Sequence, residues 1–256
     1  MDTSAPLKDD LPCIACQQRL CRFVDGQKPD ITPLRIELQR GDRLECMTGN
    51  CLKFWSVVRG TTAVCTVLKD GRRQIVALAG PRDAICGMLA DGHSPHWLEA
   101  LEPCEVCEID FTPRAAILAK DARFMRALMD IMHDQLVRTS QHLITLGRLD
   151  STERVILFIG QLALCSAAED GTPRPVTLPM SREDIADYLG LNAETVSRIL
   201  TKLRKSGLVK FLNRSEFVVP DLDALRRRLP MQLMNDQASV IGQFADGRTG
   251  ERRAQA

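Results

Sequence analysis

The sequence has no excess of charge of either sign and no long apolar stretch. Lys and Arg number 34 against 33 Asp and Glu, a formal net charge of +1, so any basic surface for nucleic acid must be local. No run reaches the roughly 18 uninterrupted apolar residues of a membrane span. Residues 1–12 lack the basic and apolar regions of a signal peptide. We therefore expect a cytoplasmic protein that does not enter a membrane.

The composition also excludes a mostly disordered or fibrous chain, because 45% hydrophobic and 26% charged residues are typical of a globular protein. A length of 256 residues favours two compact domains. Ten cysteines are unexpected, since an intracellular chain has little use for a disulfide scaffold. Cys13, Cys16 and Cys21 lie in one short segment, and Cys104 and Cys107 form a second C-x-x-C. Either a metal uses these thiols, or most are buried apolar side chains.

Turns and apolar runs divide the chain into five predicted parts. Residues 1–30 are polar apart from the cysteines, and we expect them to need a ligand in order to fold. Short β-rich runs between turn residues predict an antiparallel β domain over residues 31–114, with a hairpin tip at Asp70-Gly71. A long helix is predicted over residues 115–150, a DNA-binding domain over 151–230 and a flexible tail over 231–256.

The long predicted helix carries side chains spaced alternately three and four residues apart, as in the seam of a coiled coil. These are Met129, Met132, Leu136, Thr139, Leu143 and Leu146. Such a seam either pairs with a second chain or packs on the core of its own domain. Its methionines and threonine favour a modest contact that can be switched, rather than a tight zipper.

Residues 181–207 follow the pattern of a helix-turn-helix. Ser181 is the expected N-cap of a first helix, which Gly190 ends, and Asn192 is the expected N-cap of a second, which ends at Ser206-Gly207. Apolar residues recur on one face of the second helix, at Val196, Ile199, Leu200 and Leu203. A helical hairpin with a solvated polar face is the alternative, but it does not explain why caps, turn and termination agree.

The other face of the second helix has side chains suited to DNA bases. Glu194, Ser197 and Arg198 project together from its first turns, where recognition helices contact base edges. Arg can bind guanine with two hydrogen bonds, and Glu can accept one from cytosine. Asn213-Arg214-Ser215 is the predicted tip of a wing hairpin. Seven basic against four acidic residues between Leu178 and Arg214 provide local positive charge for DNA phosphates.

Three stretches carry a resemblance to the Crp/Fnr superfamily of bacterial transcription regulators. Its winged helix-turn-helix resembles LPMSREDIADYLGLNAETVSRILTKLRKSGLV, in which the E-T-V-S-R core is similar to the Fnr branch. Its β-roll is similar to RGDRLECMTGNCLKFWSVVRGTTAVCTVLKDGRRQIVALAG, and the Fnr-branch segment with the distal cluster cysteine resembles GHSPHWLEALEPCEVCEI. The resemblance covers about residues 10–225. It implies an α+β protein with a double-stranded β-helix (β-roll) sensor domain, a long dimerisation helix and a C-terminal winged helix-turn-helix domain.

The resemblance also implies how such a regulator acts. A homodimer joined along the 129–146 seam binds a palindrome of TTGAT-type half-sites in double-stranded DNA. The residues that contact DNA are Glu194, Ser197 and Arg198 at the bases, with Thr195 and Lys202 beside them. Anaerobic or microaerobic genes are activated, and RNA polymerase is contacted through β-roll loops such as the one at Asp70-Gly71. No catalysis is expected.

An oxygen-labile [4Fe–4S] cluster is a further implication of the resemblance. Cys13, Cys16 and Cys21 offer three thiolates, and Cys107 in E-V-C-E-I matches the distal ligand of the family. Cluster assembly is then expected to control dimerisation and DNA binding. Only four residues separate Cys16 from Cys21, fewer than is usual in the family, so the oxygen lability of the cluster is expected to differ.

Other interpretations remain open. Cys13, Cys16, Cys104 and Cys107 would suit tetrahedral zinc, and a two-iron cluster or no metal are further alternatives. A cluster-free Crp/Fnr-type regulator would respond to haem, nitric oxide or another signal. His93 and His96 form a candidate ligand pair, although a loop pair of this kind is more often solvated. A thiol-redox enzyme is an alternative of another class, but neither C-x-x-C opens a helix in a βαβ pattern. The remaining cysteines are expected to be buried or incidental thiols: Cys46, Cys51, Cys65, Cys86 and Cys165.

Overall fold

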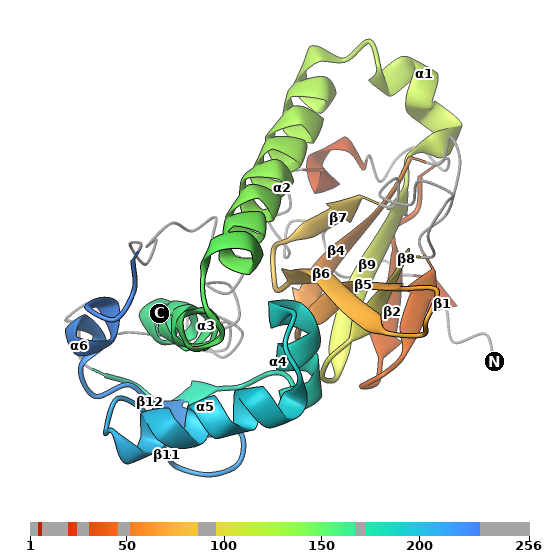
Figure 1. Cartoon of the computed structure of the whole chain (residues 1–256). Helices are drawn as coiled ribbons and strands as arrows, with labels where there is room; N and C mark the ends of the chain where they lie inside the picture. The colour runs from red at the N-terminus through yellow and green to blue at the C-terminus, as the bar shows by residue number, and fades with distance from the viewer. Residues whose placement is uncertain are drawn as a thin grey trace, which may run out of the picture. The chain divides into compact units, whose positions relative to one another are not determined.

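The computed structural model describes residues 5–6, 20–24, 31–45, 52–86, 96–166 and 173–230. The chain divides into two compact units, residues 1–137 and 138–256 (Figure 1). The first is rich in strands and the second in helices, which confirms the predicted α+β fold. Most of the predicted N-terminal arm and the whole predicted tail, 231–256, lie outside the described residues. Within the described ranges, no helix combines the length and hydropathy that a membrane span needs.

Two antiparallel sheets form the N-terminal unit. The five-stranded sheet has the order β1 (Ala5–Pro6), β2 (Leu34–Leu38), β9 (Cys104–Asp110), β4 (Lys53–Arg59) and β7 (Ala84–Cys86). The four-stranded sheet has the order β3 (Arg43–Glu45), β8 (His96–Ala100), β5 (Thr62–Val67) and β6 (Arg73–Ala79). Strands β5 and β6 form the hairpin predicted at Asp70-Gly71, where Gly71 has a φ of +86°. Most neighbouring strands are distant in sequence, as a β-roll requires.

The five-stranded sheet has two buried faces, because successive side chains of a strand point to opposite sides. Its inner face packs against the four-stranded sheet through Trp55, Val57, Ile85, Cys104 and Val106. The opposite face of the sheet, called the helix face here, carries Phe54, Cys86, Cys107 and Ile109. It packs against the helical segment that follows β9. Phe111, Phe124, Ala127 and Ile131 complete the core on this second side.

The helical segment is interrupted where a single helix is predicted. A 3-10 turn (Thr112–Arg114) leads into the short helix α1 (Ala115–Leu118). The chain then leaves the helical conformation, and the long helix α2 covers Ala122–Arg148. The Asp121 carboxylate accepts the backbone N–H of Arg123 at 2.8 Å, which satisfies an amide at the start of α2. The interruption therefore has a local cause, a capping aspartate, although no Pro or Gly lies there.

The C-terminal unit contains α3 (Ser151–Ser166), β10 (Val176–Thr177), α4 (Arg182–Leu189), α5 (Ala193–Lys205), β11 (Lys210–Phe211), β12 (Glu216–Val218) and α6 (Leu222–Arg226). Strands β11 and β12 form the predicted wing, and β10 adds a third strand beside β12 that was not predicted. The predicted apolar face of α5 is buried, with side chains that are 0 to 6% exposed: Val196, Ile199, Leu200 and Leu203. Each such burial stabilises the fold by roughly 1.5–3 kcal/mol.

Candidate functional site

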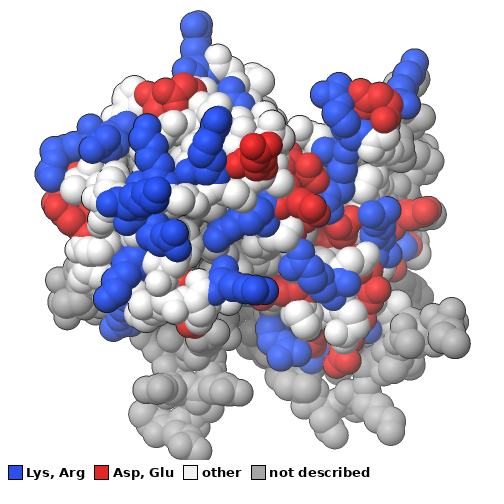
Figure 2. All heavy atoms as spheres, turned by 60° about the horizontal axis from the view of Figure 1, so that its bottom comes forward, with Lys and Arg blue, Asp and Glu red and all other residues white. Residues whose placement is uncertain are grey.

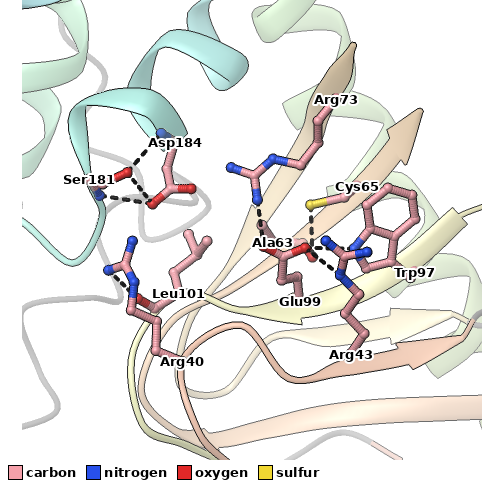
Figure 3. A network of polar contacts seen from close by, with 10 residues as sticks. All are labelled: Arg40, Arg43, Ala63, Cys65, Arg73, Trp97, Glu99, Leu101, Ser181 and Asp184. Carbon is pink, nitrogen blue, oxygen red and sulfur yellow. Dashed lines mark hydrogen bonds and ion pairs between the residues drawn. The ribbon is translucent and has the colours of Figure 1, made fainter. Parts of the chain in front are cut away.

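Local hydrogen bonds set the turn between α4 and α5. Ser181 Oγ accepts the Asp184 N–H at 3.1 Å, and the Ser181 N–H donates to the Asp184 carboxylate at 2.9 Å, which makes a capping box (Figure 3). Gly190, with a φ of +62°, ends α4, and Asn192 Oδ1 accepts the Thr195 N–H at 2.7 Å where α5 begins. The predicted caps are confirmed, and they fix the direction of α5 relative to α4.

The predicted DNA-contacting residues all lie on α5. Glu194, Ser197, Arg198 and Lys202 are exposed, and Thr195 is half-buried. Since the apolar face of the same helix is buried, these exposed side chains form the surface that α5 presents to solvent. Their individual contacts with bases or phosphates remain predictions.

A groove of about 480 Å³ lies between α5 and the wing. Its α5 wall includes Ser197, Thr201 and Arg204, and its other lining residues are Arg182, Leu200, Phe211, Asn213 and Arg214. In the view of Figure 2, Lys and Arg side chains gather toward the left. The groove combines three guanidinium groups with small polar side chains, which suits a phosphate backbone. The i, i+4, i+7 spacing of Ser197, Thr201 and Arg204 places these side chains on one side of α5, but the spacing alone does not predict the groove, which also needs the wing.

Arg182 is held at the edge of this groove by the wing. Its guanidinium lies 5.4 Å from the centre of the Phe211 ring, and burial lowers its pKa. Its Nη1 is buried without a hydrogen-bond partner among the described residues. Arg182 therefore contributes a partly buried guanidinium group to the lining of the groove.

The four-stranded sheet contains a closed polar network (Figure 3). Glu99, 6% exposed, accepts hydrogen bonds from Arg43 Nε at 3.0 Å, from Trp97 Nε1 at 2.8 Å and from Arg73 Nη1. Arg43 also lies 4.8 Å from the centre of the Trp97 ring. Because both carboxylate oxygens of Glu99 have donors, its buried charge is compensated, and the network stabilises the sheet.

Two of the four predicted cluster ligands lie in one buried group of residues. Cys21, in a 3-10 turn at Cys21–Phe23, is 5% exposed, and Cys107 of β9 is 6% exposed. Both belong to the core on the helix face, together with Cys86, which no spacing in the sequence groups with them. Cys13 and Cys16 lie outside the described residues. The described residues alone contain no group of three or more metal-ligating side chains arranged for a metal ion.

Cys104 is separated from Cys107 by the sheet itself. Side chains at i and i+3 of a strand point to opposite faces, and Cys104 belongs to the inner-face core. Its Sγ donates to the carbonyl oxygens of Thr61 and Glu102, each at 3.0 Å, and burial raises its pKa to about 11. One metal ion cannot bind both cysteines, so the zinc set with Cys104 and Cys107 is inconsistent with the structure.

The remaining cysteines and histidines add no described ligand set. Cys65 and Cys86 are fully buried, as expected for structural thiols. Cys46, Cys51 and His93, as well as the side chain of Cys165, lie outside what the structure describes. His96 begins β8.

The predicted seam of α2 is an exposed apolar stripe. Met129, Leu136 and Leu143 are 68%, 65% and 70% exposed. Met132 and Thr139 are also exposed, whereas Leu146 is half-buried. A different face of α2 packs into the N-terminal core, through Phe124, Ala127 and Ile131. No described residue therefore buries the five exposed members of the seam.

The end of α2 is tied to α3 and α4 by one arginine. Arg154 of α3 donates to the carbonyl oxygens of Leu146 at 2.6 Å, Leu149 at 3.0 Å and Leu189 at 3.0 Å. Nearby, the rings of His142 and Tyr188 are stacked, 4.3 Å apart. Burial lowers the pKa of His142 to about 4, so this imidazole is neutral at pH 7.

Comparisons with known proteins identify the C-terminal region. Residues 153–228 match the model of a Crp-like helix-turn-helix domain. A probable transcriptional activator of Rhizobium leguminosarum bv. viciae is 30% identical over 223 residues, which are 85% of this chain and 92% of the relative. The nitrogen fixation regulation protein FixK of Azorhizobium caulinodans is 37% identical over 172 residues, 67% of this chain and 69% of the relative.

Similarity extends to the whole fold. The fumarate and nitrate reduction regulatory protein of Escherichia coli K12 is 28% identical over 184 residues, 72% of this chain and 74% of the relative. The solved structure of FixK2 from Bradyrhizobium japonicum superimposes with a TM-score of 0.67 at 26% identity, covering 77% of this chain and 98% of that one. These similarities include both the β-rich unit and the helix-turn-helix.

Proposed function

Because the chain belongs to the Crp/Fnr family of transcription regulators, which bind DNA as dimers and are not enzymes, we propose that it senses oxygen or redox state. In this proposal Cys13, Cys16, Cys21 and Cys107 hold a [4Fe–4S] cluster. Its presence favours association of two chains and binding to a palindromic DNA site that controls anaerobic or microaerobic genes.

The burial of Cys21 and Cys107 in the same core supports this proposal most directly. The two cysteines come from segments far apart in sequence, yet both lie in the core on the helix face. A cluster supplies iron that thiolates bind and that oxygen can remove. If the sulfurs of Cys21 and Cys107 are both ligands, the cluster would connect the turn at Cys21–Phe23 to β9 by bonds to iron, in addition to the apolar contacts of this core.

The same core contains the first turns of α2. The Phe23 and Phe124 rings pack edge to face with their centres 5.2 Å apart, and Phe111 and Phe124 are also 5.2 Å apart. A change in the position of residues 20–24 therefore acts on the helix that carries the exposed seam. A difference of a few kcal/mol from this core is enough to shift an equilibrium between monomer and dimer.

Dimerisation matters because one chain has only one recognition helix. Two such helices must lie about 34 Å apart to enter successive major grooves on one side of DNA. In our proposal Glu194, Ser197 and Arg198 contact bases, and Thr195 and Lys202 contribute beside them. RNA polymerase is contacted through the β5–β6 hairpin tip, next to Leu68, which is 48% exposed.

Anaerobic purification followed by controlled air exposure tests the proposal. We expect iron and sulfide in the anaerobic protein, a broad absorbance near roughly 400 nm, and a sedimentation mass of a dimer that falls to a monomer in air. DNA affinity should fall with it. Leu143→Glu places like charges across the seam and should give a monomer that does not bind DNA and keeps its cluster. An unchanged mass with unchanged DNA affinity contradicts the switch even if iron is present, and switching without iron favours a cluster-free regulator.

The recognition helix can be tested separately. Arg198→Ala should cost about 1–3 kcal/mol on the specific site and relax discrimination at one guanine. Lys202→Ala should weaken all sequences similarly and reduce the salt slope by about one unit. Binding titrations on specific and random DNA at several salt concentrations measure both effects. An equal loss on both DNAs in Arg198→Ala would remove this residue as a base reader.

A further inference from the structure

Ser56 lies on the helix face of the five-stranded sheet, between the strands that carry Cys107 and Cys86. In the register of the sheet it is directly opposite Cys107 of β9 on one side and Ala84 of β7 on the other. Its neighbour in β4, Phe54, points into the same core. Ser56 is 3% exposed, so its hydroxyl is shielded from water.

The hydroxyl of Ser56 has no hydrogen-bond partner among the described residues. Such a buried, unpaired hydroxyl destabilises a fold, and native proteins rarely keep one without a reason. Other buried hydroxyls of this unit are paired. Thr62 Oγ1 donates to the Ala79 carbonyl at 3.3 Å, and Thr61 Oγ1 donates to the Glu102 carboxylate at 2.6 Å.

We propose that Ser56 is a positioning residue for the cluster and that its hydroxyl donates a hydrogen bond to the sulfur of Cys107 when that sulfur is a thiolate ligand. The inference rests on the proposed function above. A thiolate is a charged acceptor, and hydrogen bonds to charged groups are about twice as strong as neutral ones. Donors to the sulfurs of a cluster also raise its reduction potential, because they stabilise the more negative, reduced state.

Removing the Ser56 hydroxyl should stabilise the iron-free chain but weaken the cluster in the loaded chain. In Ser56→Ala without iron, an unsatisfied group is gone, and we expect the Tm to rise by about 2–4 °C. With the cluster bound, the same change removes a hydrogen bond to a charged sulfur. We then expect a lower reduction potential and loss of the 400 nm absorbance in air that is faster by on the order of ten-fold.

Two further variants make the assignment specific. Ser56→Thr keeps a hydroxyl in a residue suited to strands, and it should retain the potential and the air stability of the wild type. Thr62→Val is the matched control, because it removes a buried hydroxyl that already has a partner in the other sheet. It should lower the Tm of both forms and leave the potential unchanged.

The experiment combines thermal unfolding of the iron-free chain with potentiometric titration and air exposure of the loaded chain. The assignment is supported if Ser56→Ala raises the Tm of the iron-free chain but lowers the reduction potential and the air stability of the loaded chain, while Ser56→Thr behaves like the wild type. A loaded Ser56→Ala chain with wild-type potential and air stability overturns it and leaves the proposed function intact. A wild-type chain that takes up no iron and sulfide under anaerobic conditions overturns both.

Discussion

The two faces of the five-stranded sheet place their cysteines in different surroundings. On the inner face, the Cys104 thiol donates to two backbone carbonyl oxygens. On the helix face, Cys107 lies in a core with two more cysteines, opposite Ser56, whose hydroxyl has no hydrogen-bond partner in the described part of the chain. A C-x-x-C on a strand is therefore not a chelating pair. The face on which a thiol lies, rather than its spacing in the sequence, decides which ligand set it can join.

Packing differs between the faces as well. Gly60 has a φ of +84°, and a Cβ added there would lie 2.6 Å from the Pro103 carbonyl oxygen and 2.7 Å from the Cys104 sulfur. The environment of Cys104 thus leaves no room for an added atom. The helix face is instead covered by the turn at Cys21–Phe23 and by α2 rather than by a second sheet.

The strongest test of this difference is to replace each of the two cysteines, Cys104 and Cys107, by serine in separate variants. Cys107→Ser should abolish the absorbance near roughly 400 nm in anaerobically purified protein, because a cluster thiolate is lost. Cys13, Cys16 and Cys21 are expected to behave in the same way. Cys104→Ser should keep the absorbance, and Cys86→Ser is the matched control on the helix face. Loss with Cys104 and retention with Cys21 would reverse our assignment.

A smaller effect is expected from crowding the inner face. Gly60→Ala combines a strained positive φ with a clash against backbone, and we expect it to lower the free energy of unfolding by about 3 kcal/mol or more. Gly71→Ala has a similar φ of +86° with nothing within 4 Å of the added Cβ, and should cost only about 1–2 kcal/mol. Urea unfolding of the two variants compares them directly. Equal losses would show that the environment of Cys104 is not tightly packed.

The smallest expected effect is a pH dependence from Cys104. Its pKa is about 11 in the fold against an ordinary value of 9.0, so the folded state holds this proton more tightly than the unfolded state does. The resulting stabilisation is complete below about pH 9 and is lost as the pH rises toward 11. Unfolding under reducing conditions between pH 8 and pH 10.5 should show a steeper decline for the wild type than for Cys104→Ala. Parallel curves would contradict a buried, protonated thiol.

The C-terminal unit could be predicted from the sequence in most of its detail, because its features depend on neighbours in the chain. Ser181, Gly190 and Asn192 each act within a few residues, and the apolar spacing of α5 directly gives its buried face. The third strand of the wing sheet, β10, was missed because two residues provide too little pattern. The groove was missed because it needs the wing to be placed beside α5.

The N-terminal unit was predictable only as a set of strands. Which strands are neighbours depends on contacts between distant segments, and β9 lies between β2 and β4. The position of Ser56 opposite Cys107, and of Cys86 opposite Phe54, follows from that order and from the register of the strands. The interruption before α2 was predictable in principle, since an aspartate at position 121 is a favourable cap.

Arg154 gives the C-terminal unit a mechanical property. One guanidinium is bonded to carbonyl oxygens at the ends of both α2 and α4, where the negative ends of the two helix dipoles favour a cation. The last turn of α2 and the end of α4 therefore share one hydrogen-bond donor, and a shift of either carbonyl would have to stretch or break a bond to the same side chain.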